Sequence, residues 1–525
     1  MKAKNKVEAA PGKADLVVRE GLILGHPGSD SIAIAGGQII AHGQFADLKP
    51  LVGPQTHLVK LGGRVVAPGF IDSHIHFLEA AAAATGISVA RCRTVGDVLA
   101  DLRIAAGKTP PGNWLRAFGC DEALMLDGRG PTRAELDHSV PKNPLRLKHQ
   151  TLHATWLNSR AIALLGFEAP DFKPPDGANM IRDAAGKLTG LVIGMETWLS
   201  RHLPPVTAAE SESRARIMSR ELASNGVTNF TDATTRNGVE EVELFAKLAQ
   251  SGAIAQRLGV MIGGQHLESA ARCEQIASAA NIKLAGVKFM PGYEYDRAGL
   301  ARPVGLAIAR GLDCAFHATE VEELDEALAA IETAKANYAG EREIPRFRIE
   351  HGGLIPPNYI DRLAAMNAWV VTNPGFIHFR GAKYAAEPGL VAHLYRAKSL
   401  KDAGVHLAGA TDAPVTPGRP LAAIATAVLR TTLEGIELAS AEALSVAEAF
   451  AMFTIDAARL GQLDAGVIET GCVADLIVLP RDPLSLAPAD LMNLAVDITI
   501  VGGRVVYERG RPAIASSDSA DLHSS

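Results

Sequence analysis

Two histidines, His74 and His76, stand two residues apart in the segment Asp72-Ser73-His74-Ile75-His76. The apolar run before them predicts a buried strand. Because side chains at positions i and i+2 of a strand point to the same face, the two imidazoles project together from its end. Such a pair can chelate zinc or a similar divalent metal. An HxH pair alone arises often by chance, so a metal site depends on further ligands elsewhere in the chain.

Four more side chains of suitable chemistry each lie at the end of a short apolar segment. They are Lys288 in GVKFM, His317 in FHATE, His351 in IEHGG and Asp412 in GATDAP. Any single histidine is more often a core or surface residue than a ligand. Four candidates at four predicted strand ends, together with the HxH pair, favour one shared site.

The segments that carry these residues recur along the chain and predict the strands that position them. They are VVAPGFIDSHIH, GVTNFTDA, RLGVMIGG, GVKFM, CAFHATE, FRIEHGG, WVVTNPG and HLAGATD. Their spacing of roughly 20–40 residues is what a strand, a helix and two loops need in a parallel βαβ unit. Eight such units predict a (β/α)8 TIM barrel, whose reactive groups lie at the carboxyl ends of its strands.

The gap after the HxH pair is too long for one such unit and predicts an inserted lobe over about 80–215. Within it, LRLKHQTLHATWLNSRAIALLGF predicts one strand that enters a helix.

Short alternating segments at both termini predict a small β-sandwich built from residues 14–66 plus 465–512, beside a barrel over 67–464. Each set of strands is too small to be stable alone, which favours one sandwich. The alternative is two independent hairpins.

Composition narrows the class of protein. The 525 residues are 47% hydrophobic with a net charge of −6, which gives no reason to expect nucleic acid or an acidic membrane as a partner. Five scattered cysteines without a CxxC pair do not support a disulfide framework or a zinc knuckle. The first residues lack an apolar signal segment and the apolar runs are too short to span a membrane. We expect a cytoplasmic protein that acts on a small molecule.

The combined motifs carry a specific resemblance. PGFIDSHIHF, the regular strands and GATDAPV resemble the amidohydrolase superfamily. WLRAFGCDEALM, the run from LDHSVPKNPLRLKHQ through LHATWLNSRAIALLGF, and DAAGKLTGLV resemble the branch that includes the N-substituted formamide deformylases. This resemblance covers almost the whole chain.

The resemblance implies a ligand for each position of the metal site. In the superfamily the first-strand pair, here His74 and His76, binds the more buried metal. A fourth-strand lysine, here Lys288, is carbamylated and bridges two metals in binuclear members. The fifth- and sixth-strand histidines, here His317 and His351, bind the second metal. A carbamate makes physical sense because a free ammonium beside divalent cations would be repelled.

The eighth-strand aspartate of the superfamily, here Asp412, binds metal and handles the proton of the attacking water. The implied cofactor is a divalent metal, one or two zinc ions, and barrels of this kind often form homo-oligomers. The implied reaction is hydrolysis of a non-peptide C–N bond in an amide, a formamide or a related group. Alternatives are hydrolysis of an aryl ester, carbamate or lactone, a deamination or decarboxylation at the same site, and metal binding without catalysis. For Lys288, the alternative is a structural lysine paired with a carboxylate.

The chain departs from the branch in three loops that shape the pocket. The family reads close to HAxGD after its fifth-strand histidine, whereas this chain reads His317-Ala-Thr-Glu320. A loop with Asp-Gly is replaced by Met290-Pro-Gly-Tyr-Glu-Tyr295, and Thr411 stands where serine is common. These departures put the substrate preference of the branch in doubt.

Several other side chains are weaker candidates for contacts with the substrate. For each, packing or surface exposure is an equal or better interpretation. They are His153, Trp114, Asp121, Tyr293 and His378, and we interpret Cys120 as a packing residue.

Overall fold

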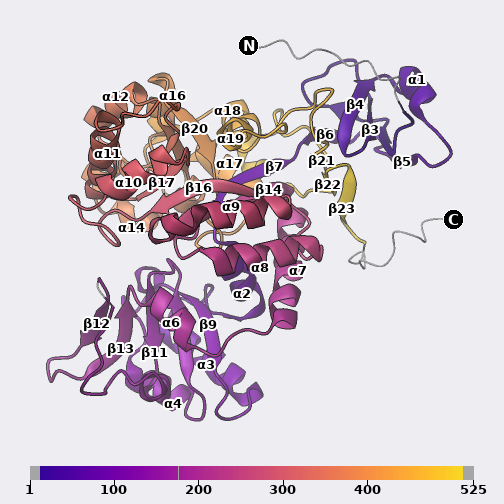
Figure 1. Ribbon diagram of the computed structural model, residues 1–525. Coiled ribbons are helices and arrows are strands. Elements are labelled where there is room, and N and C mark those ends of the chain that lie inside the picture. Colours follow the sequence, from indigo (N-terminus) through magenta and orange to yellow (C-terminus); the bar gives the residue numbers. More distant parts are fainter. Residues whose placement is uncertain (1–11, 176, 512–525) are drawn as a thin grey trace.

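The centre of the computed structural model, which describes residues 12–175 and 177–511, is a barrel of eight strands (Figure 1). Every ladder between neighbouring strands is parallel. In spatial order the strands are β7 (Phe70–Ile75), β14 (Val227–Asp232), β15 (Arg257–Gly263), β16 (Lys283–Phe289), β17 (Cys314–Ala318), β18 (Phe347–His351), β19 (Trp369–Thr372) and β20 (His406–Gly409). The backbone N–H of Asp412 donates to the His74 carbonyl at 2.9 Å, which ties the end of the eighth strand to the first. The predicted (β/α)8 barrel is confirmed.

Helices follow the strands and pack around the barrel. They include α2 (Phe77–Thr85), α7 (Ala208–Ser224), α8 (Val239–Gln250), α9 (Ala270–Ala279), α10 (Ala301–Ala309), α11 (Val321–Ala336), α12 (Pro357–Ala365), α16 (Ala397–Asp402), α17 (Pro420–Leu429), α18 (Val446–Met452) and α19 (Ile455–Gly461). Their sequences explain the packing: in α8 the buried residues Val242, Phe245 and Ala246 recur at helical spacing, so one face enters the core. Burial of a side chain such as Phe245 contributes about 1.5–3 kcal/mol.

A lobe leaves the barrel after α2 and returns to it at α7 (Figure 1). Its six-stranded sheet contains β12 (Asn179–Arg182), β13 (Leu188–Ile193), β11 (Ala154–Leu157), β10 (Leu145–His149), β9 (Leu115–Cys120) and β8 (Ile87–Ser88), in that order. Its helices are α3 (Val95–Lys108), α4 (Arg133–Ser139), α5 (Ser159–Leu164) and α6 (Glu196–His202).

The expectation of one strand that enters a helix within the lobe is wrong. Two antiparallel strands, β10 and β11, precede α5. The chain reverses between them where Leu152 takes a positive φ of 68°, which the apolar pattern does not signal because leucine rarely adopts it.

Strands from both termini share one β-rich region beside the barrel (Figure 1). One sheet contains β4 (Gln38–Gly43), β3 (Ser31–Ala35), β1 (Leu16–Arg19) and β5 (His57–Lys60). The other contains β2 (Leu22–Ile23), β6 (Val65–Pro68), β21 (Leu476–Leu479), β22 (Ile498–Val501) and β23 (Arg504–Glu508). Apolar side chains of both sheets, such as Ile34 and Val478, form one core.

The division of the chain into residues 14–66 with 465–512, 67–464 and a lobe over about 80–215 stays a prediction. Residue 512, like residues 1–11 at the start of the chain, lies outside the described residues.

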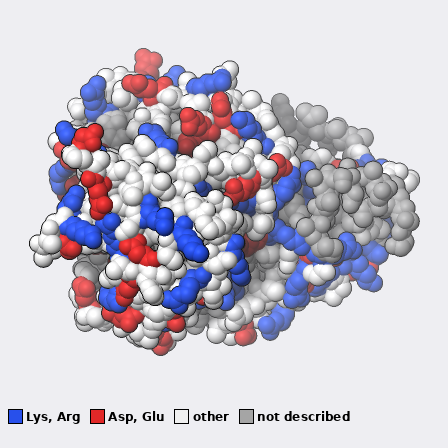
Figure 2. Space-filling view, turned by 90° about the horizontal axis from the view of Figure 1, so that it is seen from below, with Lys and Arg blue, Asp and Glu red and all other residues white. Residues whose placement is uncertain are grey.

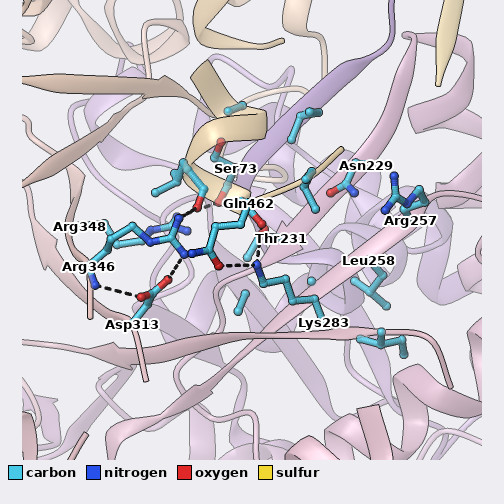
Figure 3. Close-up of a pocket in the computed structure, with 18 of the residues that line it drawn as sticks. Ser73, Asn229, Thr231, Arg257, Leu258, Lys283, Asp313, Arg346, Arg348 and Gln462 are labelled. Atoms are coloured by element: carbon cyan, nitrogen blue, oxygen red, sulfur yellow. Dashed lines mark hydrogen bonds and ion pairs between the residues drawn. The ribbon is translucent and has the colours of Figure 1, made fainter. Parts of the chain in front are cut away.

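At the amino-terminal end of the barrel, a cavity of about 310 Å³ is lined by the first residues of several strands and by the carboxyl end of α19 (Figure 3). Lys283 Nζ donates to the Gly461 carbonyl at 2.6 Å, and Arg346 donates to the Leu460 carbonyl at 2.6 Å. Cations at the last carbonyls of a helix stabilise its carboxyl end. The charged groups here therefore serve the stability of the barrel.

On one face of the molecule, basic and acidic side chains are interspersed (Figure 2). The five cysteines are free thiols. Among residues 12–175 and 177–511, we find no helix that combines the length and the apolarity needed to cross a bilayer.

Candidate metal centre

The structure brings all six predicted residues to the wall of one cavity of about 120 Å³, at the carboxyl ends of the barrel strands. Each comes from the strand end on which the sequence places it. His74 lies in β7 and His76 follows it, Lys288 lies in β16, His317 in β17, His351 in β18, and Asp412 lies three residues beyond β20.

Asp412 lies at the centre of this arrangement. Its Oδ1 is 3.2 Å from His76 Nε2 and 3.6 Å from His74 Nε2. One ligand atom from each of these three residues lies within 4.8 Å of the others. On the other side, the ring centroids of His351 and His317 are 4.7 Å apart. The ligand atoms of His74, His76 and Asp412 are therefore close enough to bind one cation together.

Three polar atoms in this cavity are buried without a hydrogen-bond partner in the described structure: His74 Nε2, Lys288 Nζ and Asp412 Oδ1. A buried polar atom without a partner costs about 1–3 kcal/mol, so three in one place require an explanation. Imidazole nitrogen and carboxylate oxygen are the donors that zinc and similar cations bind. The residues therefore fit a divalent cation.

Three histidines of the cavity wall, His74, His76 and His351, are oriented by a hydrogen bond on the other ring nitrogen. His76 Nδ1 lies 2.9 Å from the Thr234 hydroxyl, and His351 Nδ1 donates to Asn373 Oδ1 at 2.8 Å. His74 Nδ1 donates to the carboxylate of Glu350. Such contacts fix the tautomer and the direction of a ligand nitrogen before any metal binds.

Glu350 and Arg348, which sequence reasoning missed, form a buried ion pair below His74. The Arg348 guanidinium donates through Nε and Nη2 to Glu350, and Nη2 also donates to the Ser73 carbonyl at 2.8 Å. Burial raises the pKa of Glu350, but the charges of Arg348 and Lys288 outweigh it and hold that pKa well below the usual range. His74 therefore faces a Glu350 carboxylate that stays ionised, while burial lowers the pKa of the His74 ring to about 3.

Backbone geometry is unusual at two of the candidate ligands. His351 and Asp412 have φ values of 70° and 58°, in the left-handed region that non-glycine residues seldom adopt. Such conformations cluster at functional sites, where the surrounding structure holds them. Asp72 helps to hold the conformation at Asp412, because its carboxylate accepts hydrogen bonds from the N–H of the preceding residue Thr411 at 2.9 Å and from the Thr411 hydroxyl. Thr411 thus anchors the backbone next to Asp412 through both its N–H and its hydroxyl.

Of the weaker candidates, His153 lies in the cavity wall. It reaches over from the lobe, with its ring centroid 5.9 Å from that of His317 and stacked on Tyr293 at 5.7 Å. Burial, and then the neighbouring His76, lower the pKa of His153 to about 4. Tyr293 is about half exposed, beside the cavity.

The other weak candidates lie elsewhere. Asp121 is buried in the lobe, where it pairs with Arg380 at 2.6 Å and lies 3.5 Å from His149. Trp114 lines a different cleft, and His378 Nδ1 lies 3.1 Å from a backbone carbonyl outside the cavity. Cys120 packs in the core of the lobe, as we expected.

Comparisons with known proteins agree with this architecture. The sequence profile described as the amidohydrolase family matches residues 57–507. N-substituted formamide deformylase of Arthrobacter pascens is 27% identical over 522 residues, which cover 92% of this chain and 95% of that protein. The putative amidohydrolase YtcJ of Bacillus subtilis (strain 168) is 26% identical and covers 92% of this chain and 96% of its own. The crystal structure of an uncharacterized metal-dependent hydrolase from Pyrococcus horikoshii OT3 has a TM-score of 0.69 at 20% identity, over 90% of this chain and 99% of that one.

Proposed function

Because the chain is an enzyme of the amidohydrolase family, we propose that it hydrolyses a non-peptide C–N bond of a small molecule with the help of a divalent metal. The observation that carries this proposal is the convergence of three unpartnered buried atoms on one cavity, at His74, Lys288 and Asp412. A non-catalytic protein has no need for an ionised carboxylate with a free oxygen at that place.

The proposed ligands divide into two groups around Asp412. His74 and His76 would hold one zinc ion, while His317 and His351 would hold a second if the site is binuclear. In that case Lys288 would be carbamylated and would bridge the two ions. Support for the bridge comes from the buried Lys288 Nζ, which has no hydrogen-bond partner among the described residues. When bound, a divalent metal lowers the pKa of water from 15.7 towards about 7 and polarises a carbonyl oxygen.

Asp412 is the proposed proton carrier of the reaction. Burial raises its pKa, but its contact with His76 and the neighbouring imidazoles outweigh this and lower the pKa below the usual range. The carboxylate is therefore ionised at neutral pH and can take a proton from the attacking water. The same carboxyl group can then return that proton to the nitrogen of the leaving amine.

One relative supports an amine as the leaving group. N-substituted formamide deformylase of Arthrobacter pascens is 27% identical, and the alignment covers 92% of this chain and 95% of that protein. This similarity supports an amide or a formamide as the substrate class. The same chemistry also cleaves esters and carbamates. A panel of aryl and alkyl formamides, amides, carbamates and esters, tested with zinc-loaded protein, separates these classes. Faster turnover of esters than of all amides would contradict the proposal.

The variant Asp412→Asn tests the proton carrier. We expect it to keep most of its metal, measured by elemental analysis, and to lose on the order of 10²–10⁴ in kcat, the usual effect of removing a general base. Asp475→Asn is the matched control, because Asp475 is also buried but accepts from the Gly502 N–H in the β-rich region. A metal-replete Asp412→Asn variant with near-normal kcat would exclude the role. The double variant His74→Ala/His76→Ala should bind no zinc at the tighter site.

A further inference from the structure

A cleft of about 670 Å³ opens between the lobe and the barrel, next to the metal cavity. On the lobe side it is lined by β9 and β10, and on the barrel side by α2 and α7. Glu79, Lys148 and Arg236 line both this cleft and the metal cavity, so these three ion-paired side chains lie at the boundary between the two spaces. We call this space the lateral cleft.

The lateral cleft carries more positive than negative charge. Five of its lining side chains are cations: Arg116, Arg146, Lys148, Arg214 and Arg236. Three carboxylates pair with them, because Glu79 contacts Lys148 and Arg236, Glu210 contacts Arg214, and Glu196 contacts Arg146. Five cations and three carboxylates give this group a net charge of +2, because Lys148 and Arg236 share Glu79, and Arg116 has no carboxylate partner among the described residues.

Arg116 is the clearest case. Its guanidinium donates to the Pro204 carbonyl at 2.6 Å, and no carboxylate of the described residues lies within 4 Å of it. Burial lowers its pKa, and so do the charges of Arg214 and Arg146, although the charge of Glu210 acts in the opposite direction. A half-buried positive charge next to two other arginines has an electrostatic cost, and a bound anion would reduce that cost.

The strand register explains why Arg116 and Arg146 lie together. In the parallel ladder of β9 and β10 they are direct partners, so both project from the same face of the lobe sheet. Their neighbours Leu115 and Leu145 point the other way, into the core of the lobe. Like charges in register destabilise a sheet. Arg146 Nε is moreover buried without a hydrogen-bond partner in the described structure.

Much of the remaining wall of the cleft is apolar. It includes Trp114, Phe118, Leu203 and Leu244. A wall of this kind favours a ligand that combines a hydrocarbon or aromatic part with its negative charge.

We propose that the lateral cleft binds the carboxylate end of an organic substrate, with Arg116 and Arg146 as the carboxylate-binding residues. The proposal builds on the proposed function: the amide at the other end of the same molecule would lie in the metal cavity, and an apolar segment would lie along Trp114 and Phe118. The substrate class is thus an amide or formamide that carries a distant carboxylate.

The test measures binding to the full-length protein by isothermal titration calorimetry and requires no turnover, so its result is independent of whether the hydrolysis proposal holds. The probes are 4-phenylbutyrate and its neutral counterpart 4-phenylbutanamide. We expect the acid to bind more tightly than the amide, and Arg116→Gln and Arg146→Gln each to weaken it about tenfold, the effect of losing one charge-assisted hydrogen bond. Arg103→Gln, an exposed arginine of the lobe outside the cleft, should change nothing.

Two further measurements decide the place and the chemistry of the anion. A probe that binds at the metal loses affinity in His74→Ala and keeps it in Arg116→Gln, and this result would overturn the proposal. If inorganic phosphate binds as tightly as 4-phenylbutyrate and depends equally on Arg116, the cleft does not select organic carboxylates and the proposal is wrong. Binding that is retained in His74→Ala and lost in Arg116→Gln supports it.

Discussion

Replacing Glu350 by glutamine removes one negative charge from the interior of the barrel while preserving the size of the side chain. Glu350 is fully buried, and its carboxylate accepts two hydrogen bonds from Arg348 and one from His74. In the variant, the glutamine oxygen at the position of Oε2 can still accept from His74 Nδ1 and Arg348 Nη2, but the amide NH2 at the position of Oε1 cannot accept from Arg348 Nε, and the charge of Arg348 loses its counterion. Removal of one partner of a buried ion pair costs about 3–5 kcal/mol, because the other charge stays buried without compensation. We expect a loss of stability of that size in the metal-free protein.

The same substitution should weaken metal binding for a separate reason. A glutamine oxygen can still accept from His74 Nδ1, but it carries no charge to raise the basicity of the ring. Changes to groups that orient a metal ligand typically cost 10–100-fold in affinity. This corresponds to about 1.4–2.7 kcal/mol. Titration of zinc against a competing chelator measures the affinity, and the urea midpoint of the metal-free protein measures the stability.

The double variant Arg348→Met/Glu350→Gln separates the two effects. It removes both charges, so most of the lost stability should return, whereas zinc affinity should stay 10–100-fold below that of the unmodified protein. If Glu350→Gln binds zinc with unchanged affinity, Glu350 does not orient His74 for a metal. If its urea midpoint is also unchanged, the reasoning on the buried ion pair fails as well.

Two further predictions concern the bridge and the barrel. In a crystal structure of the zinc-loaded protein, electron density should continue beyond Lys288 Nζ and join two metal ions, and a free amine paired with a carboxylate would contradict this. Gly409→Ala should lower stability by about 1–3 kcal/mol, because a Cβ at this position would lie 2.4 Å from the ring of Phe453. Gly43→Ala, where a Cβ meets nothing within 4 Å, is its control in the same urea experiment.

The barrel could be predicted because each of its strands leaves the same short pattern in the sequence, and this pattern recurs along the chain. Each strand is a short apolar segment that ends in a polar group, and a parallel barrel places all those ends on one face. The same topology predicts that His317, His351 and Asp412, which are far apart in the sequence, lie close together. Periodicity alone could not find the reversal at Leu152, because an apolar residue with positive φ leaves no trace in the pattern.

Contacts between distant strands explain what else sequence reasoning missed. His74 and Glu350 are 276 residues apart, and their contact depends on which barrel positions face inwards at the same height. One signal was present: Arg348 and Glu350 stand two residues apart in the apolar strand FRIEH and must point to the same side. The partnership of Arg116 with Arg146 depends on strand order in the lobe, which no local pattern reports.

The two carboxylates that face the ring nitrogens of His74, those of Glu350 and Asp412, differ in their surroundings, and that difference supports different roles for them. Glu350 is saturated: Arg348 and His74 occupy its oxygens, and it lies too deep to meet a substrate. Asp412 lines the cavity and keeps Oδ1 without a hydrogen-bond partner among the described residues. A proton carrier needs a free oxygen that faces the reacting atoms, and an orienting group needs fixed partners on every side. The same barrel thus holds one carboxylate that orients a ligand and another that can exchange a proton. Both groups have the same chemistry, and their different burial and hydrogen-bond partners give them different roles.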